Sequence, residues 1–424
     1  MKIIKSPDRS QWRELCQRPQ IEVEFLESAV RNILNRVKKS GDEALKEITL
    51  QYDKVKLDTL QVTEDEIDEA VANLPSNLKT AILSAAKNIE TFHASQKRSI
   101  TKVETMPGVT CWRKGTPIQK VGIYIPGGSA PLFSTVLMLG VPAQLAGCDE
   151  VVLCTPPDKN GKINPAILFA AQLTGVKKIF KVGGAQAIGA MAYGTETVPS
   201  VSKIFGPGNQ YVTNAKQIIS QEGIAIDMPA GPSEVLVIAD KAAHPGYLAA
   251  DLLSQAEHGA DSQVVLATTH IELISRVLTE IESQLELLPR KEIAREALTN
   301  SLAIVFDSKN DLVDFVNAYA PEHLIINTTD SDELADKIIN AGSIFLGPYT
   351  PEAAGDYASG TNHTLPTNGF AKAFGGVSLE SFMKYITLQK ITKAGLDLLG
   401  PIVEEMAEAE QLKGHAEAVR VRRK

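Results

Sequence analysis

Cysteine is scarce in this chain. Its 424 residues include only Cys16, Cys111, Cys148 and Cys154, and their spacing does not match a thiolate metal site. Such a pattern indicates reduced thiols, so we expect a cytoplasmic protein. The first residues, MKIIKSPDRSQWREL, lack a sustained apolar core and a small-residue cleavage pattern, so we expect no signal peptide.

An excess of positive charge is also absent. The chain has 51 acidic and 43 basic residues, a formal net charge of -8, and its only basic cluster is the terminal RVRRK. This balance argues against a nucleic-acid-binding surface. The longest apolar stretch, residues 131–148, is interrupted by Ser, Thr, Pro, Gln and Gly, which favours a buried helix over a membrane span.

The order of the remaining segments predicts an α/β fold. Residues 20–98 have a helical pattern, with a capping box at Thr63 and Glu66. From residue 120 to 347, short β-branched runs alternate with helical segments, which is typical of parallel strands joined by crossover helices. The runs form two groups, roughly 120–230 and 231–350, joined by the turn-rich IDMPAGPSE. From residue 377 onward the pattern predicts helix, packed on the body or on another subunit.

Three glycine-rich turns follow predicted strands and resemble phosphate-binding turns. IPGGSAP, VGGAQAIGA and FGPGNQYV lie beside Tyr124, Gln186 and Asn209. In an open parallel sheet, ligands bind at the carboxyl ends of the strands. None of the turns is the G-x-G-x-x-G fingerprint, and an equally good interpretation is that Tyr124 is a strand residue while the two amides cap helices.

Polar residues gather in four further stretches. SQAEHG places Gln255 and His258 at the end of a predicted amphipathic helix that begins at Pro245, with side chains able to converge. APEHL places Glu322 and His323 on a loop at a strand entrance, where an acid and an imidazole can serve one substrate. The alternative there is a helix-ending Pro-Glu-His with a surface carboxylate.

The last two stretches lie nearer the C-terminus. GDYASGTNHTLPT contains Asp356 and His363 in a long irregular segment, which is often functional. An ordinary turn at Asp356 with a solvated His363 is the alternative. Glu410 and His415 lie in the terminal helical region, where a lone histidine is usually a surface residue.

Taken together, the motifs resemble one family. YIPGGSAP, VGGAQAIGA, FGPGNQYVT, IDMPAGPSE, LLSQAEHG, APEHL, GDYASGTNHTLPT and GHAEAV occur in this order between residues 121 and 420. This combination closely resembles the histidinol dehydrogenases. The resemblance implies a homodimeric enzyme of histidine biosynthesis that oxidises L-histidinol to L-histidine, by way of L-histidinal, in two NAD-dependent steps.

The resemblance also implies roles for the residues. Zinc would be held by Gln255, His258, Asp356 and His415 of the partner subunit, and would grip the substrate's imidazole and amino group. This nitrogen and oxygen donor set suits Zn²⁺, with Mn²⁺ or Co²⁺ as substitutes. His323 would be the base for the hydroxyl proton, and Glu322 would activate water at the aldehyde stage. Besides the zinc ligands and His323, the substrate pocket would include Ser233, His363 and Glu410, and NAD would contact Tyr124, Gln186 and Asn209.

The implied fold is a pair of incomplete Rossmann-like units. We expect an N-terminal arm (1–20), a first unit (21–120 with 231–376), a second unit (121–230) and a helical tail (377–424) that reaches the partner subunit. Two other functions stay open on the residues alone. One is a zinc hydrolase that needs no NAD, and the other is a metal-dependent sensor of amino acids or imidazoles that has lost catalysis.

Overall fold

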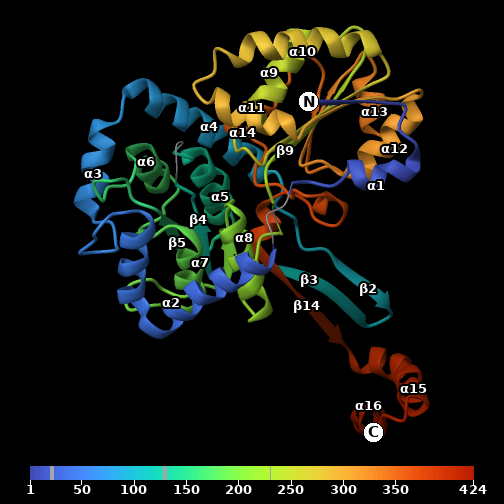
Figure 1. Cartoon of the computed structure of the whole chain (residues 1–424). Helices are drawn as coiled ribbons and strands as arrows, with labels where there is room; N and C mark the ends of the chain where they lie inside the picture. The colour runs from blue at the N-terminus through green and yellow to red at the C-terminus, as the bar shows by residue number, and fades with distance from the viewer. Residues whose placement is uncertain (20–22, 128–130, 230) are drawn as a thin grey trace.

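Two parallel sheets form the body of the molecule (Figure 1). The computed structural model describes residues 1–19, 23–127, 131–229 and 231–424. The predicted alternation of strands and helices between residues 120 and 347 is confirmed, because every strand pair in the two sheets is parallel. Among the described residues no helix combines the length and apolar character of a membrane span.

The smaller sheet has five strands and comes from the middle of the chain. Its spatial order is β6 (Lys178–Lys181), β5 (Glu150–Thr155), β4 (Lys120–Tyr124), β7 (Lys203–Phe205) and β8 (Ala225–Ile226). Its crossover helices are α5 (Phe133–Ala146), α6 (Pro165–Leu173), α7 (Gly184–Tyr193) and α8 (Gln210–Gln221). Helix α5 is the interrupted apolar stretch of the sequence, and its residues 134–143 are all buried, as the buried-helix prediction requires.

The larger sheet has six strands. Its order is β1 (Lys2–Lys5), β11 (Leu302–Val305), β10 (Gln263–Thr268), β9 (Glu234–Ala239), β12 (His323–Asn327) and β13 (Ser343–Leu346). The helices that accompany it are α9 (Pro245–Ala256), α10 (Ile271–Leu285), α11 (Lys291–Thr299), α12 (Lys309–Tyr319), α13 (Ser331–Ala335) and α14 (Glu352–Tyr357). Strand β1 was not predicted, because it is an exposed edge strand without an apolar run.

The predicted N-terminal helices are present. They are α2 (Val23–Tyr52), α3 (Glu64–Asn73) and α4 (Ser76–Ala94). The capping box of α3 is confirmed, since Thr63 Oγ1 accepts from the Glu66 amide at 3.2 Å and Glu66 accepts from the Thr63 amide at 2.9 Å. The buried side chains of these helices share cores with the five-stranded sheet. We therefore propose grouping residues 26–94 with that sheet, although the sequence had suggested the other unit.

The prediction of helix from residue 377 onward is partly wrong. Strand β14 (Met383–Ile391) pairs antiparallel with β3 (Val109–Pro117), which also pairs with β2 (Lys102–Met106). Helices α15 (Lys393–Ala409) and α16 (Lys413–Arg423) follow, as predicted. The strand was missed because its pairing partner lies more than 250 residues earlier in the chain, beyond the reach of local periodicity.

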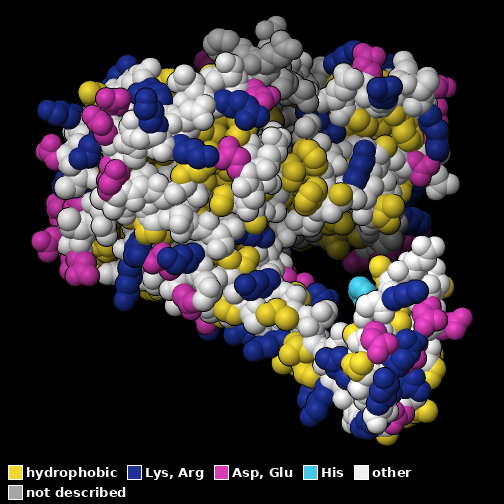
Figure 2. Space-filling view, turned by 90° about the horizontal axis from the view of Figure 1, so that it is seen from below, with side chains coloured by type: hydrophobic (Ala, Val, Ile, Leu, Met, Phe, Trp, Pro, Cys, Tyr) yellow, Lys and Arg dark blue, Asp and Glu magenta, His cyan; other side chains and the backbone are white. Residues whose placement is uncertain are grey.

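These three strands and the last two helices extend away from the body (Figures 1 and 2). We call residues 383–424 the tail. Several apolar side chains of its helices are exposed, including Leu398, Ile402 and Met406, which are 50–60% exposed. Figure 2 shows hydrophobic side chains on the tail where it stands off the body. The tail therefore has an apolar surface that the rest of the described chain does not cover.

A glycine directly after β7 lies close to the last residue of the neighbouring strand β4. Gly206 has a φ of +125°, and a Cβ atom there would lie 2.1 Å from the Tyr124 carbonyl oxygen. We expect Gly206→Ala to lower the free energy of unfolding by about 1–3 kcal/mol or more, because the cost of backbone strain and the cost of the steric clash are added together. Urea unfolding measures the loss.

The chain offers a matched control for this substitution. Gly147 also has a positive φ, +83°, but among the described residues no atom lies within 4 Å of the place that a Cβ would occupy. Gly147→Ala should therefore cost only the conformational term of roughly 1 kcal/mol. Equal losses for the two variants would contradict the close approach at Gly206.

Candidate active site

The two sheets present opposite ends to one cavity. Strands β4 and β7 direct their carboxyl ends toward it, whereas β9 and β12 direct their amino ends toward it. The cavity measures about 520 Å³ and is lined by residues of both units. Five predicted site residues are among those that line it: Asn209, Ser233, His258, Glu322 and His363. The described residues of the glycine-rich turns follow the carboxyl ends of β4, β6 and β7, as predicted, while residues 128–130 of IPGGSAP lie outside the described residues. Glu322 and His323 lie at the amino end of β12, the strand entrance that the sequence predicted.

Glu322 and His323 are held by the first residue of the neighbouring strand. The amide of Glu234 donates to Glu322 Oε2 at 2.9 Å, and the amide of Glu322 donates to Glu234 Oε1 at 3.2 Å. His323 Nδ1 lies 3.3 Å from the Glu234 carbonyl oxygen, to which it can donate. Both predicted residues are buried, Glu322 directly before β12 and His323 as its first residue. They do not form a surface Pro-Glu-His, and His323 belongs to the strand rather than to a loop.

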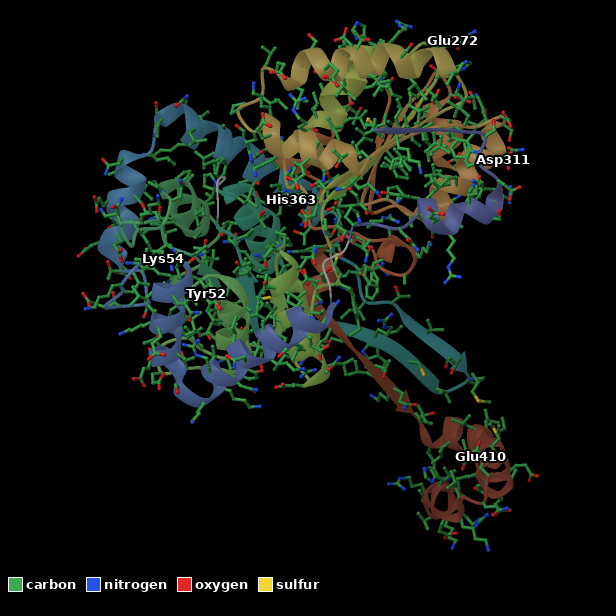
Figure 3. All side chains as sticks on the ribbon, viewed as in Figure 1. Tyr52, Lys54, Glu272, Asp311, His363 and Glu410 are labelled. Carbon is green, nitrogen blue, oxygen red and sulfur yellow. The ribbon has the colours of Figure 1, made fainter. Side chains whose placement is uncertain are left out.

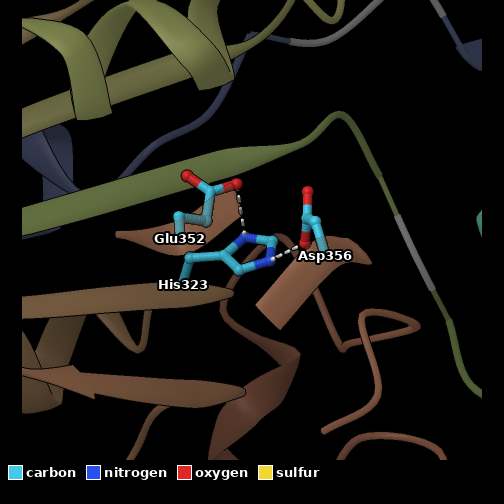
Figure 4. A group of neighbouring side chains, drawn as sticks. All are labelled: His323, Glu352 and Asp356. Atoms are coloured by element: carbon cyan, nitrogen blue, oxygen red, sulfur yellow. Dashed lines mark ion pairs between the residues drawn. The ribbon is translucent and has the colours of Figure 1, made fainter. Parts of the chain in front are cut away.

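Carboxylates surround the imidazole of His323 (Figure 4). Its Nδ1 lies 3.6 Å from Glu322 Oε2 and 3.8 Å from Glu352 Oε1, and its Nε2 lies 3.5 Å from Asp356 Oδ1. Burial alone would lower the pKa of His323, but the negative charges of Glu352 and Glu322 raise it well above the ordinary value. Burial raises the pKa of Glu322, against the effect of His323.

Asp356 is the carboxylate at the centre of the predicted histidines. It lies in helix α14, not in an irregular turn. Burial would raise its pKa, but His323, His363 and His258 together lower it. His363 Nδ1 lies 2.8 Å from the Asp356 carbonyl oxygen, and its Nε2 lies 3.0 Å from Thr135 Oγ1. Burial lowers the pKa of both His258 and His363, so these two imidazoles favour the neutral form that binds metals.

Helix α9 ends near Gln255, as the sequence predicted, but His258 lies outside the helix. Leu248, Leu252, Gln255 and Ala256 are buried on its inner face. His258 lies two residues beyond the last helical residue; it is open to solvent at the cavity wall, although enough protein surrounds the imidazole to lower its pKa. Its amide donates to the Gln255 carbonyl at 3.2 Å. In the orientation that satisfies its hydrogen bonds, the Gln255 amide nitrogen donates to Glu352 and its oxygen accepts from the Glu234 amide at 3.1 Å.

Two atoms of this cluster lack a hydrogen-bond partner among the described residues. They are Asp356 Oδ1 and His323 Nε2, and both are buried. The two atoms lie 3.5 Å from each other as an ion pair without a hydrogen bond, so the buried carboxylate oxygen retains the capacity to bind a further ligand. His323, Glu352 and Asp356 offer ligand atoms within 4.8 Å of one another and form a candidate metal group. This group shares only Asp356 with the predicted zinc ligands.

The predicted tail residues lie far from this cluster within one chain. Glu410 and His415 are both exposed. Figure 3 shows Glu410 on the tail and His363 in the body, well separated. One chain therefore does not bring these two tail residues to its own cavity.

The predicted NAD contacts have structural partners. The buried Tyr124 hydroxyl accepts from the Gly184 amide at 3.0 Å, and the Asn209 side chain caps helix α8 by accepting from the Tyr211 and Val212 amides. Gln186 is buried in α7. Tyr124 in β4 and the cap at Asn209 match the structural alternative, but Gln186 makes no cap hydrogen bond in α7. Of the three residues, Asn209 lines the cavity.

The sequence did not reveal three further residues at this site: Glu234, which contacts Glu322, Glu352, which lies beside His323, and Arg18, which contacts Glu234. Glu234 gave one usable signal, because a carboxylate at the head of the apolar run VLVIA has to find a partner once buried. Glu352 had none, since its neighbours in TPEAAGD are those of an ordinary helix start. The partner of Arg18 lies 216 residues away in the chain, so no local pattern reveals it.

Burial also affects Asp251, one helical turn before Gln255. It raises the pKa of Asp251 to about 7, from an ordinary value near 3.8. Between these two values the folded state binds more protons than the unfolded state, so this group lowers stability as pH rises. We expect Asp251→Asn to stabilise the metal-free protein at pH 8 by on the order of 2 kcal/mol, and hardly at pH 4. Denaturant unfolding at both pH values measures this, and an equal gain at both would contradict the burial argument.

Comparisons with known proteins identify the family. The family model described as "Histidinol dehydrogenase" matches residues 16–423. A histidinol dehydrogenase of Bacteroides fragilis (strain YCH46) is 60% identical over 422 residues, which cover 100% of this chain and 99% of that protein. One from Yersinia pestis is 52% identical, over 97% of this chain and 93% of its own length.

A solved structure agrees with both. The crystal structure of histidinol dehydrogenase from Elizabethkingia anophelis matches with a TM-score of 0.97 and 57% identity, covering 100% of this chain and 98% of that one. These matches favour the dehydrogenase over the hydrolase and the sensor. The chain therefore belongs to the histidinol dehydrogenase family and is an oxidoreductase of histidine biosynthesis.

Proposed function

We propose that this chain oxidises L-histidinol to L-histidine in two steps, with NAD as the hydride acceptor and one zinc ion per subunit, in the cytoplasm and as a homodimer. The observation that carries the proposal is the buried pair Glu322 and His323, held together at the cavity by Glu234. Removing a hydride from an alcohol requires a base for its proton, and the second oxidation requires an activated water.

His323 takes the base role. Its Nδ1 faces the Glu234 carbonyl, which leaves Nε2 as the nitrogen able to accept a proton. The surrounding carboxylates favour the protonated imidazole, and a divalent cation bound at Asp356 would offset part of their negative charge.

Glu322 takes the water-activating role. Its Oε2 accepts from the Glu234 amide, which fixes the carboxylate at the cavity wall. Because burial raises its pKa, the ionised form is a stronger base than an exposed carboxylate. Glu322 lies directly before His323, so the group proposed for water and the group proposed for the hydroxyl proton are neighbours, with Glu322 at the cavity wall.

The residues present fit a zinc ion. Asp356 Oδ1 is buried and unpaired among the described residues, His258 favours its neutral form, and the Gln255 oxygen keeps a second lone pair beyond its bond to the Glu234 amide. We propose Gln255, His258 and Asp356 as ligands, completed by His415 of the partner subunit. When bound, zinc supplies a positive centre that orients the nitrogen atoms of the substrate.

The remaining predicted residues complete the pocket. Ser233 and His363 line the cavity beside the zinc ligands, and Glu410 of the partner subunit joins them with the tail. For NAD we propose the opposite wall, where Asn209 and the turn at Gly206–Gly208 lie. Tyr124 and Gln186 are buried and do not line the cavity, and the Tyr124 hydroxyl accepts from the Gly184 amide of another glycine-rich turn.

Metal content distinguishes this ligand set from the group His323, Glu352 and Asp356. We expect His258→Asn to lower the zinc affinity about tenfold or more, whereas His323→Asn keeps the metal and loses turnover. The measurement is zinc per chain after dialysis, with Asp356→Asn as the variant that loses metal under both assignments. Retention by His258→Asn together with loss by His323→Asn would assign the metal to the other group.

A further inference from the structure

A buried arginine of the N-terminal arm lies behind the catalytic pair. The Arg18 side chain is 5% exposed, and the carboxylate of Glu234 is fully buried. Arg18 Nε donates to Glu234 Oε2 at 2.7 Å, and Nη2 donates to Glu234 Oε1 at 2.9 Å. This two-point pairing fixes the carboxylate plane as well as its position.

Further contacts fix the guanidinium itself. Nη1 donates to the Cys16 carbonyl and Nη2 to the Tyr319 carbonyl, both at 2.7 Å. The guanidinium carbon lies 3.5 Å from the centre of the Tyr319 ring, and the Tyr319 hydroxyl donates to Gln263 at 2.7 Å. Arg18 is therefore bound to the end of α12 and, through Tyr319, to the start of β10.

Glu234, the partner of Arg18, also holds both proposed catalytic side chains. Glu234 accepts from the Glu322 amide, donates its own amide to the Glu322 carboxylate, and offers its carbonyl to His323 Nδ1. A shift of the Glu234 side chain moves the Glu322 backbone, and with it both catalytic groups. The mechanism itself uses neither Arg18 nor Glu234.

We propose that Arg18 is a positioning residue: it clamps Glu234, and Glu234 holds Glu322 and His323 in their reactive geometry. The N-terminal arm thus belongs to the active site, although it does not line the cavity. The inference rests on the catalytic roles proposed for Glu322 and His323. Only arginine has the planar fork for this site, because a lysine ammonium cannot pair with both carboxylate oxygens in one plane.

The test is Arg18→Lys, with turnover measured per zinc-containing site. We expect kcat to fall about 10–100-fold, because small displacements of catalytic groups cost this much. The KM for histidinol should stay within about threefold, because Arg18 contacts none of the proposed zinc ligands directly. In the Arg18→Lys protein, Glu322→Gln should lower kcat by a smaller factor than it does in the wild type, since both changes act on Glu322.

The control lies on the same arm. Arg9 pairs with Asp311 and Asp314 of α12, and its guanidinium carbon lies 5.0 Å from the Trp12 ring centre, but its side chain is 62% exposed. Arg9→Lys should leave kcat and KM unchanged. If the arm only stabilises the fold, Arg18→Lys should lower the melting temperature and leave kcat per zinc-containing site unchanged, which would overturn the proposal.

A second variant covers a failure of the first to fold. In Arg18→Ala, added ethylguanidinium should restore kcat at least partly, while added ethylammonium should not. Absence of rescue in a folded Arg18→Ala protein, together with full kcat in Arg18→Lys, contradicts the clamp. Wild-type protein that forms no NADH from histidinol would instead contradict the proposed function, so the two failures are distinguishable.

Discussion

Glu322→Gln lowers the rate of the aldehyde-to-acid step about 10²–10⁴-fold, the range expected for loss of a general base. The amide side chain has nearly the same shape, and its oxygen can still accept from the Glu234 amide, so the fold and the geometry at β9 and β12 stay intact. What disappears is the carboxylate that takes a proton from water. The measurement is single-turnover NADH formation starting from L-histidinal.

A second carboxylate in the same cavity serves as the control. Glu257 also lines the cavity but has no proposed role, so Glu257→Gln should oxidise the aldehyde within about twofold of wild type. The pH dependence gives an independent check. The base is active only when ionised, and burial raises the pKa of Glu322, so the wild-type rate should fall as pH drops through that raised pKa. An unchanged aldehyde rate in Glu322→Gln would contradict the assignment.

Mixing two inactive variants restores activity if the tail completes the partner's site. Glu322→Gln has a defective body and an intact tail, whereas His415→Ala has an intact body and a defective tail. In a mixed dimer, one of the two sites combines the intact body with the intact tail. Random exchange of subunits should therefore recover about a quarter of the wild-type activity per chain.

The recovery of activity should be large because one chain does not bring its own tail residues to its own cavity. His415 is exposed and lies with Glu410 on a tail that stands away from the body (Figures 1 and 3). Exchange is promoted by dilution and reconcentration, and activity is measured over time. A mixture of His415→Ala with Glu322→Gln/His415→Ala should stay inactive. Absence of recovery in a mixture shown by mass spectrometry to contain mixed dimers would contradict a shared site.

The sequence predicted well what local pattern determines. The parallel strands were predicted from short apolar runs. Helix α9 was predicted from Pro245 and the spacing of Leu248 and Leu252, with Gln255 in its last turn. The capping box at Thr63 fixed the start of α3 for the same reason, since all its atoms lie within one turn. The family motifs include Glu322, His323 and Asp356, and in the structure the His323 ring lies 3.6 Å from the Glu322 carboxylate and 3.5 Å from the Asp356 carboxylate.

Long-range pairing is what the sequence could not predict. The local pattern of β14 is typical of a helix, and these residues form a strand only because they pair with β3. Glu234 and Arg18 are separated by 216 residues, and each is an ordinary charged residue until burial forces them to pair. The sequence did place Glu322 and His323 at a strand entrance, and β12 begins at His323. It could not show that this amino end faces the carboxyl ends of a second sheet across one cavity.

A four-electron oxidation at one site yields two NADH per L-histidinol, and this yield can be measured. The experiment uses purified, zinc-loaded protein with NAD in excess, and it counts NADH by absorbance against histidinol consumed. We expect two NADH for each histidinol and L-histidine as the product. One NADH with accumulating aldehyde, or none with histidinol bound, would rule out the four-electron oxidation.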